Sequence, residues 1–435
     1  MDQRRQELSD GSPLSGREFQ FKPALISSLK HGYSRANFRD DALAGLTVAI
    51  VALPLSMALA IASGLPPERG LYTAIVGGFL ISLLGGSRFQ IGGPAGAFIV
   101  LISLTVERHG YDGLVLATAL AGLIMIAIGL LRLGTYIRYI PHAVTVGFAA
   151  GIAVIIFASQ LRDFLGLEIA KEPGPLLAKI GALWDALPTM RPMALAISIA
   201  GVLVIVLIRK FLPRWPSFLI VVTVSAAFVA LFHPDVATIG SRFGAVPNSL
   251  PAPSLPPFDW QKIYRVLPDA IAIALLGSIE SLLSAVVADR MSGDKHRSNG
   301  ELVAQGLANV GSVAFGGMPV TGTIARTATN VRSGAKSPVS GILHAVYLLV
   351  FMMIAAPLAV HIPLAALAAV LVVVAFNMSD HHEFRALLTR SWPEAIVLLA
   401  VFLITAFHDL VIAIGVGVAL SFLFRAARLW RQSRD

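Results

Sequence analysis

Two ionisable side chains lie inside stretches of this chain that otherwise suit a lipid bilayer. Arg326 stands in the middle of "FGGMPVTGTIARTATNVRSG" (Phe315–Gly334), and Glu280 stands in "ALLGSIESLLSAVVADR" (Ala274–Arg290). An arginine held away from water is costly unless a carboxylate or a bound anion pairs with it. A carboxylate in apolar surroundings loses its hydration and can take up a proton. The two residues therefore predict an anion site at Arg326, with Glu280 as its partner in the empty site and as the carrier of a coupling proton, or of sodium.

The composition places these residues in a polytopic membrane protein. Of the 435 residues 56% are hydrophobic and 14% are charged, and the mean hydropathy is +0.76, whereas soluble domains are about a quarter charged. The first 40 residues are polar and mixed in charge, which does not favour a cleavable signal peptide. The chain has no cysteine, which excludes disulfides, iron–sulfur clusters and thiolate zinc sites.

Apolar segments predict fourteen membrane spans, several of them short because Gly or Pro interrupts them. The expected spans are 42–63, 71–85, 89–106, 113–131, 143–161, 193–209, 216–232, 266–288, 300–314, 318–333, 339–359, 363–378, 393–407 and 410–424. Lysine and arginine concentrate at the two ends, with seven in the first 40 residues and four in the last eleven. The positive-inside rule then predicts that both termini face the cytoplasm of a bacterial inner (plasma) membrane.

Two of the expected spans share the same irregularity. Span three contains "FQIGGPAGAFIVLIS" (Phe89–Ser103) and span ten contains "GGMPVTGTIARTATN" (Gly316–Asn330), so each has Gly-Gly followed by a proline. Such a start cannot continue a helix, and each span is expected to be a short extended piece followed by a half-helix. The Pro- and Ser-rich stretch 232–260 divides the spans into two halves of seven. Seven is odd, so the halves are expected to be inverted repeats whose half-helix N-termini meet and attract an anion.

Two long motifs resemble one family of anion transporters. The run "LPLSMALAIASGLPPERGLYTAIVGGFLISLLGGSRFQIGGPAGAF" (Leu53–Phe98) is similar to the first helices of the SulP sulfate permeases, which are related to pendrin and prestin. The run "NGELVAQGLANVGSVAFGGMPVTGTIARTATNVRSGAKSPVSGI" (Asn299–Ile342) resembles the ninth and tenth helices of that family. The resemblance implies an all-α, fourteen-span fold shared with uracil permeases, a substrate site between spans three and ten, and homodimers.

The resemblance also implies a domain organisation. A core domain (about 42–131 and 266–359) would move against a gate domain (about 143–232 and 363–424) inside the transmembrane region 42–424. A cytoplasmic segment 1–41 precedes it and a basic cytoplasmic tail 425–435 follows it, where relatives usually continue into a STAS domain that this sequence lacks.

Family positions carried onto this chain give the candidate site. Thr323 matches a small hydroxyl position beside the ligand, Arg326 matches a common arginine, and Glu280 matches an acidic position linked to coupling in bacterial members. The candidate substrate-binding residues are Ser56, Leu59, Ala95, Gly96, Ala97, Gly322, Thr323, Ile324, Ala325 and Arg326. Leu55 and Ala95 stand where many relatives have glutamine and an aromatic residue. A larger and less polar cavity would favour a small organic anion such as a mono- or dicarboxylate, although sulfate and bicarbonate satisfy the same electrostatics.

Secondary active anion transport by alternating access, with proton symport, is the function that these features favour. A nucleobase permease on the same fold and a channel or electromechanical protein are the alternatives; the first would place acidic groups where Arg326 stands. Arg326 could also serve only as a structural partner of backbone carbonyls or Glu280. His381 and His382 suit an interfacial helix better than a metal site. The chain has no Walker motif or hydrolase triad, so we expect neither an enzyme nor a cofactor. The net charge of +9 follows from the positive-inside bias and does not indicate nucleic acid.

Overall fold

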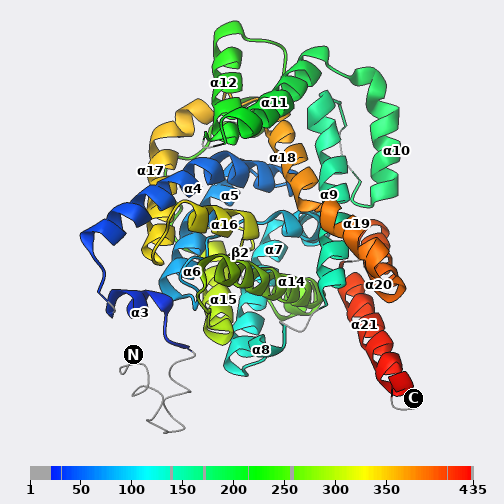
Figure 1. Cartoon of the computed structure of the whole chain (residues 1–435). Helices are drawn as coiled ribbons and strands as arrows, with labels where there is room; N and C mark the ends of the chain where they lie inside the picture. Colours follow the sequence, from blue (N-terminus) through cyan, green and yellow to red (C-terminus); the bar gives the residue numbers. More distant parts are fainter. Residues whose placement is uncertain are drawn as a thin grey trace.

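The computed structural model describes residues 21–30, 32–137, 141–169, 173–213, 215–254, 259–408 and 410–432. These residues form a bundle of helices with one two-stranded sheet near its centre (Figure 1). Among them, seven helices are long and apolar enough to cross a membrane. Three shorter apolar helices, Ser217–Phe232, Trp392–Phe407 and Ile412–Ala426, accompany them.

The first half of the described chain runs from α3 to α12. Its elements are α3 (Ala24–Lys30), α4 (Arg35–Ala62), α5 (Pro67–Tyr72), η1 (Thr73–Gly77), α6 (Gly78–Leu84), β1 (Gly92–Gly93), η2 (Gly96–Phe98), α7 (Ile99–Leu130), α8 (Gly134–Ile137), α9 (His142–Leu165), α10 (Leu176–Ala186), η3 (Leu187–Thr189), α11 (Pro192–Phe211) and α12 (Ser217–Phe232).

The second half runs from α13 to α21. Its elements are α13 (Ile239–Phe243), α14 (Trp260–Ser292), α15 (Ser298–Ala314), β2 (Thr321–Gly322), α16 (Ile324–Arg332), α17 (Val339–Ala359), α18 (Leu364–Met378), α19 (His381–Arg390), α20 (Trp392–Phe407) and α21 (Leu410–Gln432).

Each of the fourteen expected spans includes a helical element, although within the described residues only seven helices have the length and hydropathy of a full crossing. Expected span two is built from three pieces, α5, the π-helical η1 and α6. Expected spans three and four form one helical run that breaks at Gly110, where φ is 70° and ψ is −178°. A backbone in that region favours glycine, so the break is encoded locally.

The helices pack into two groups. In the first, α7 packs against α14 and α15, α17 packs against α4, and α16 packs against α14 and α4. In the second, α9 packs against α18 and α20, α11 packs against α18, and α20 packs against α21. Figure 1 shows α9, α19, α20 and α21 along one side of the bundle, away from α3 and α6. Helices α4, α12 and α18 connect the two groups by direct contacts.

Part of the Pro- and Ser-rich stretch between the halves is hydrogen-bonded to the second half. It contains α13, and its backbone is joined to the α17–α18 connection by bonds from Ile239 N to Ile362 O (2.9 Å) and from Leu364 N to Ala237 O (2.9 Å). Residues 255–258 of this stretch lie outside the described residues, as does most of the expected N-terminal segment.

Candidate functional site

The two irregular segments meet as paired strands. β1 and β2 are antiparallel, with Gly92 opposite Gly322 and Gly93 opposite Thr321. A Cβ at Gly93 would collide with Nη1 of Arg326, so any side chain there would force the guanidinium to move. The sequence-predicted juxtaposition of spans three and ten is therefore present, and its register is set by backbone hydrogen bonds.

Each strand leads into a helix whose start is uncapped. Ala95 precedes η2 and α7, and Thr323 precedes α16, both in extended conformation and neither with a side-chain capping bond. The Thr323 hydroxyl donates instead to the carbonyl of Ile91, at 3.4 Å. The first N–H groups of a helix have no acceptor within the helix and carry partial positive charge. Two such starts held together by β1 and β2 bring unpaired N–H groups to one place, and helix starts of this kind can attract anions.

Arg326 lies between β1 and α4 rather than in open space. It is 3% exposed, and its Nη2 donates to the Ser56 hydroxyl at 3.3 Å. Its Nε and Nη1 have no hydrogen-bond partner among the described residues. The guanidinium therefore keeps N–H donors without acceptors. Its positive charge adds to the partial positive charge of the adjacent helix starts, because a low-dielectric interior weakens the field little.

Glu280 lies on the face of α14 that is turned toward β2 and α16. Gly277, three residues earlier, accepts from the Thr321 hydroxyl at 3.0 Å, and Ser284, four residues later, donates to Thr327 at 3.0 Å. Residues at this spacing share one helix face, so Glu280 stands between the two contacts. Its Oε2 is buried without a hydrogen-bond partner among the described residues.

Glu280 and Arg326 attract each other electrostatically, but they are not joined directly. No ion pair within 4.0 Å links them in the described part of the chain, and Arg326 contacts Ser56 instead. The direct pairing of Glu280 with Arg326 therefore stays a prediction. Both groups retain polar atoms that a ligand or a proton could satisfy.

The other predicted site residues divide into an exposed and a buried set. Ile324 is 40% exposed and Ala325 is also exposed, at the very start of α16. The buried or nearly buried set consists of Ser56, Leu59, Ala95, Ala97, Gly322 and Thr323. The N-terminus of α16 is therefore the accessible side of the candidate site, while the buried set supports it.

Gly96 marks where the first half-helix meets the second group of helices. A Cβ at Gly96 would lie 3.3 Å from Ile156 on α9, 3.6 Å from Met378 on α18 and 3.9 Å from Leu59 on α4. The half-helix start is thus enclosed between elements of both groups. Sequence reasoning did not identify Ile156 or Met378, because a single apolar residue in an apolar span carries no local signal.

A polar stripe on α16 anchors the second half-helix, and sequence reasoning missed it. Thr327 accepts from the amide of Ile91 at 3.1 Å, and Asn330 donates to the carbonyl of Phe89 and to the Ser340 hydroxyl, both at 2.9 Å. Thr323, Thr327 and Asn330 recur at helical spacing, which is the signal that could have revealed this face.

A second buried carboxylate, Glu301 on α15, holds the segment that leads into β1. Its Oε2 accepts from the amides of Gly86 and Ser87 at 2.8 and 3.0 Å, and its Oε1 accepts from Gln90 and Gln305 at 3.0 and 2.9 Å. The side chain is completely buried. We call these five residues the Glu301 clasp; it fixes the approach to the site, and both oxygens of the Glu301 carboxylate accept hydrogen bonds within it.

The described residues contain no group of three or more side chains suited to hold a metal. His381 and His382 open α19, and their rings pack together with centroids 4.2 Å apart. Their helix follows the end of α18 and precedes α20, remote in sequence from the paired strands.

The comparison with protein families gives a match over most of the chain. Residues 38–401 match the model of the sulfate permease family. A "putative sulfate transporter", YvdB of Bacillus subtilis, is 42% identical over 404 residues, which cover 93% of this chain and 76% of that protein. The "bicarbonate transporter BicA" of Picosynechococcus is 34% identical and covers 88% of this chain and 69% of its own.

Solved structures agree with this match. The transmembrane domain of a cyanobacterial bicarbonate transporter, BicA, superposes with a TM-score of 0.79 at 34% identity, covering 87% of this chain and 97% of that one. The structure of SLC26A9 gives a TM-score of 0.85 at 20% identity over 96% of this chain and 70% of its own. At that identity SLC26A9 supports the fold alone.

Proposed function

Because the chain belongs to the sulfate permease family, a family of multi-pass membrane proteins, we propose that it is a secondary active anion transporter. One observation carries the proposal. Two uncapped helix starts, those of η2 and α16, are held together by β1 and β2 with the buried guanidinium of Arg326 beside them. Such an arrangement replaces the lost hydration of an anion by backbone N–H groups and a fixed positive charge.

Transport would follow from movement between the two groups of helices. We assign the first group to the core domain expected from the sequence (about 42–131 and 266–359) and the second group to the gate domain (about 143–232 and 363–424). A Cβ at Gly96 would lie 3.3 Å from Ile156 and 3.6 Å from Met378, both in the second group, and this proximity supports the proposed division. A core that slides along the gate would carry the anion between the two sides of the membrane. We further propose an inverted fourteen-span topology with cytoplasmic termini, and a homodimer.

Coupling to protons is proposed for Glu280. Its carboxylate has a buried oxygen without a hydrogen bond and no ion-pair partner within 4.0 Å among the described residues. Taking up a proton removes the charge that competes with the anion for Arg326, so a proton and an anion would enter together. Sodium is the other candidate coupling ion for the same carboxylate.

The substrate we propose is an oxyanion, with sulfate and bicarbonate ahead of a carboxylate. The two relatives named above are described as sulfate and bicarbonate transporters. Leu55, Leu59 and Ala95, which were expected to line room for a carbon skeleton, are 8%, 2% and 2% exposed. Little of their surface is left for an organic substrate, so the organic anion becomes the second candidate.

The test is uptake of radiolabelled sulfate and bicarbonate into vesicles that contain the purified protein. Arg326→Ala is expected to lower uptake at least about 100-fold, since it removes the fixed charge from a low-dielectric site. Arg385→Ala, at an exposed position on α19, is the matched control and should transport normally. Normal kinetics in folded Arg326→Ala protein would refute this site. If mono- and dicarboxylates inhibit uptake and the inorganic anions do not, a carboxylate would move ahead of sulfate and bicarbonate as the proposed substrate.

A further inference from the structure

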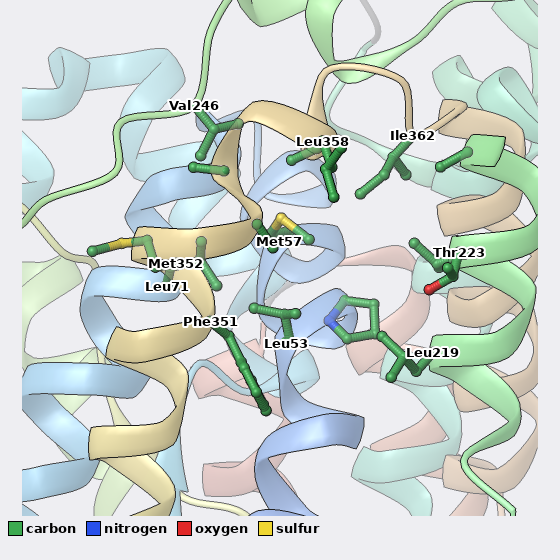
Figure 2. A pocket seen from close by; sticks show the side chains of 16 residues that line it. Leu53, Met57, Leu71, Leu219, Thr223, Val246, Phe351, Met352, Leu358 and Ile362 are labelled. Atoms are coloured by element: carbon green, nitrogen blue, oxygen red, sulfur yellow. The ribbon is translucent and has the colours of Figure 1, made fainter. Parts of the chain in front are cut away.

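A cavity of about 140 Å³ lies between α4, α12 and α17 (Figure 2), and none of its described lining residues belongs to β1, β2 or α16. Six of its wall residues, two from each helix, are Leu53 and Met57, Leu219 and Thr223, and Phe351 and Met352. Helices α4 and α17 belong to the first group of helices and α12 packs against α4 from the second. The cavity therefore lies at the boundary between the proposed core and gate.

Small side chains create this space. Ala226 faces it from α12, and Ala355 and Ala359, one turn apart, face it from α17. Pro54 lines it from α4 and lies inside that helix, where its missing amide interrupts the hydrogen-bond ladder. Atoms that line an unfilled space lose dispersion contacts, so an occupant of matching chemistry would stabilise the surrounding helices.

The walls select an apolar occupant. All the lining side chains are apolar except that of Thr223, and no charged or titratable group is among them. An ion or a polar solute would lose its hydration there with almost no compensating hydrogen bonds. A cavity of about 150 Å³ with such walls accepts a group the size of benzene, which corresponds to a short piece of a hydrocarbon chain.

The bilayer is the source of that hydrocarbon. Leu358 both lines the cavity and is 67% exposed, so it lies at the rim. Ile354, one turn earlier on α17, is 71% exposed, and Leu231 on α12 is 75% exposed. Large apolar side chains this exposed on spans of a membrane protein face lipid. The exposed apolar rim of the cavity is thus suited to contact acyl chains, whereas Met352, at 1% exposure, is deep in its wall.

We propose that the end of one lipid acyl chain inserts between α12 and α17 and occupies this cavity. The occupied form holds α12 at its present distance from α4 and α17, so lipid favours the conformation described here over one in which the two groups have moved. A ligand shifts such an equilibrium only by its difference in affinity for the two states. The conformational part rests on the proposed transport function, while the binding part does not.

Photolabelling tests the binding part directly. The protein is placed in nanodiscs with a phospholipid that carries a diazirine at the end of one acyl chain, irradiated, digested and mapped by mass spectrometry. Label is expected on Ile354 from the outer lipid and also on Met352, which lipid reaches only through the cavity. Absence of label on Met352 in the wild-type protein would overturn the proposal.

Cavity-filling variants supply the matched comparison. Ala226→Phe should reduce label on Met352 at least about fivefold while label on Ile354 stays constant, because the new ring takes the space of the chain. Leu231→Phe, on the lipid-facing side of the same helix, should leave both unchanged. If Ala226→Phe fails to fold, Ala355→Ile fills the space from α17 with fewer atoms. Unchanged label on Met352 in a folded filled variant would refute the proposal.

Uptake measurements test the conformational part. A permanently filled cavity should lower the maximal uptake rate and leave the apparent affinity for the anion nearly unchanged, because the filled variant resists movement but keeps the site intact. Wild-type uptake rates in Ala226→Phe would refute the lipid's effect on conformation. The labelling pattern is read without any transport, so a failure of the proposed transport function would leave it unaltered.

Discussion

Two carboxylates on neighbouring helices, the buried Glu301 and the half-buried Glu280, have opposite environments. All four hydrogen bonds of Glu301 come from Gly86, Ser87, Gln90 and Gln305, at 2.8 to 3.0 Å. Glu280 stands near a buried arginine but makes no ion pair with it within 4.0 Å, and its Oε2 has no partner among the described residues. The glutamate side chain thus has hydrogen bonds to both oxygens at position 301, whereas at position 280 one oxygen lacks a partner.

This difference supports a structural role for Glu301 and the proposed functional role for Glu280. A carboxylate that is hydrogen-bonded on both oxygens is held in one state, because any movement or protonation breaks several bonds. A buried group with unused polar atoms calls for another explanation, such as a ligand, an ion or a proton. Arg326, with Nε and Nη1 unpartnered in the described structure, belongs with Glu280 in the second class.

The largest effect on stability is expected in the clasp. Glu301→Ala leaves the buried amides of Gly86 and Ser87 without acceptors, and each unpaired group costs roughly 1–3 kcal/mol. The folded fraction that survives heating, measured by size-exclusion chromatography in detergent, should fall at a much lower temperature than for the wild-type protein. Glu301→Gln, which keeps one carbonyl acceptor, should be intermediate. A variant Glu301→Ala as heat-resistant as the wild type would remove the contrast between the two carboxylates.

Gly93→Ala should change the position of the Arg326 guanidinium without changing any charge. The added methyl group would collide with Nη1 of Arg326 and force the guanidinium to move. We expect uptake to fall about 10- to 100-fold, the effect of a misplaced functional group, while the protein remains folded. Gly415→Ala is the control, since a Cβ at Gly415 meets no atom within 4 Å. Equal uptake by the two variants would show that the position of Arg326 is not critical.

Glu280→Gln should alter coupling rather than folding. The amide keeps the shape of the side chain but cannot exchange a proton, so uptake should become independent of an inward proton gradient. The measurement compares initial uptake rates with and without a gradient, and a several-fold stimulation of the wild-type protein should disappear. The idea fails if the gradient stimulates the variant as strongly as the wild type.

Ser56→Ala is expected to have the smallest effect. It removes the hydroxyl that accepts from Arg326 at 3.3 Å and leaves the guanidinium in place. One such hydrogen bond contributes about 1 kcal/mol, so the apparent affinity for the anion should weaken by about fivefold. Ser56→Thr keeps the hydroxyl and serves as the control for loss of the acceptor. A change above about 100-fold would assign Ser56 a direct contact with the substrate.

Much of the site was accessible from local sequence. The two Gly-Gly and proline patterns predicted an extended piece and a helix start at each position, because those residues restrict the backbone wherever they stand. The partners of Glu301 were not predictable, since Gly86 and Ser87 lie more than 200 residues away along the chain. The direction of the Arg326 side chain could not be predicted from local sequence either, because the space between β1 and α4 exists only after both elements have packed.

Composition, hydropathy and the matched breaks in spans three and ten by themselves predicted a polytopic membrane protein, and they led to the proposed anion site at Arg326. These are properties of short segments, and they follow from the cost of transferring polar groups into lipid. The tertiary structure alone decided which carboxylate is satisfied, which face of α16 is accessible, and where an apolar cavity remains between α4, α12 and α17. Such outcomes depend on which distant side chains fill the space around a group, and no local pattern in the chain contains that information.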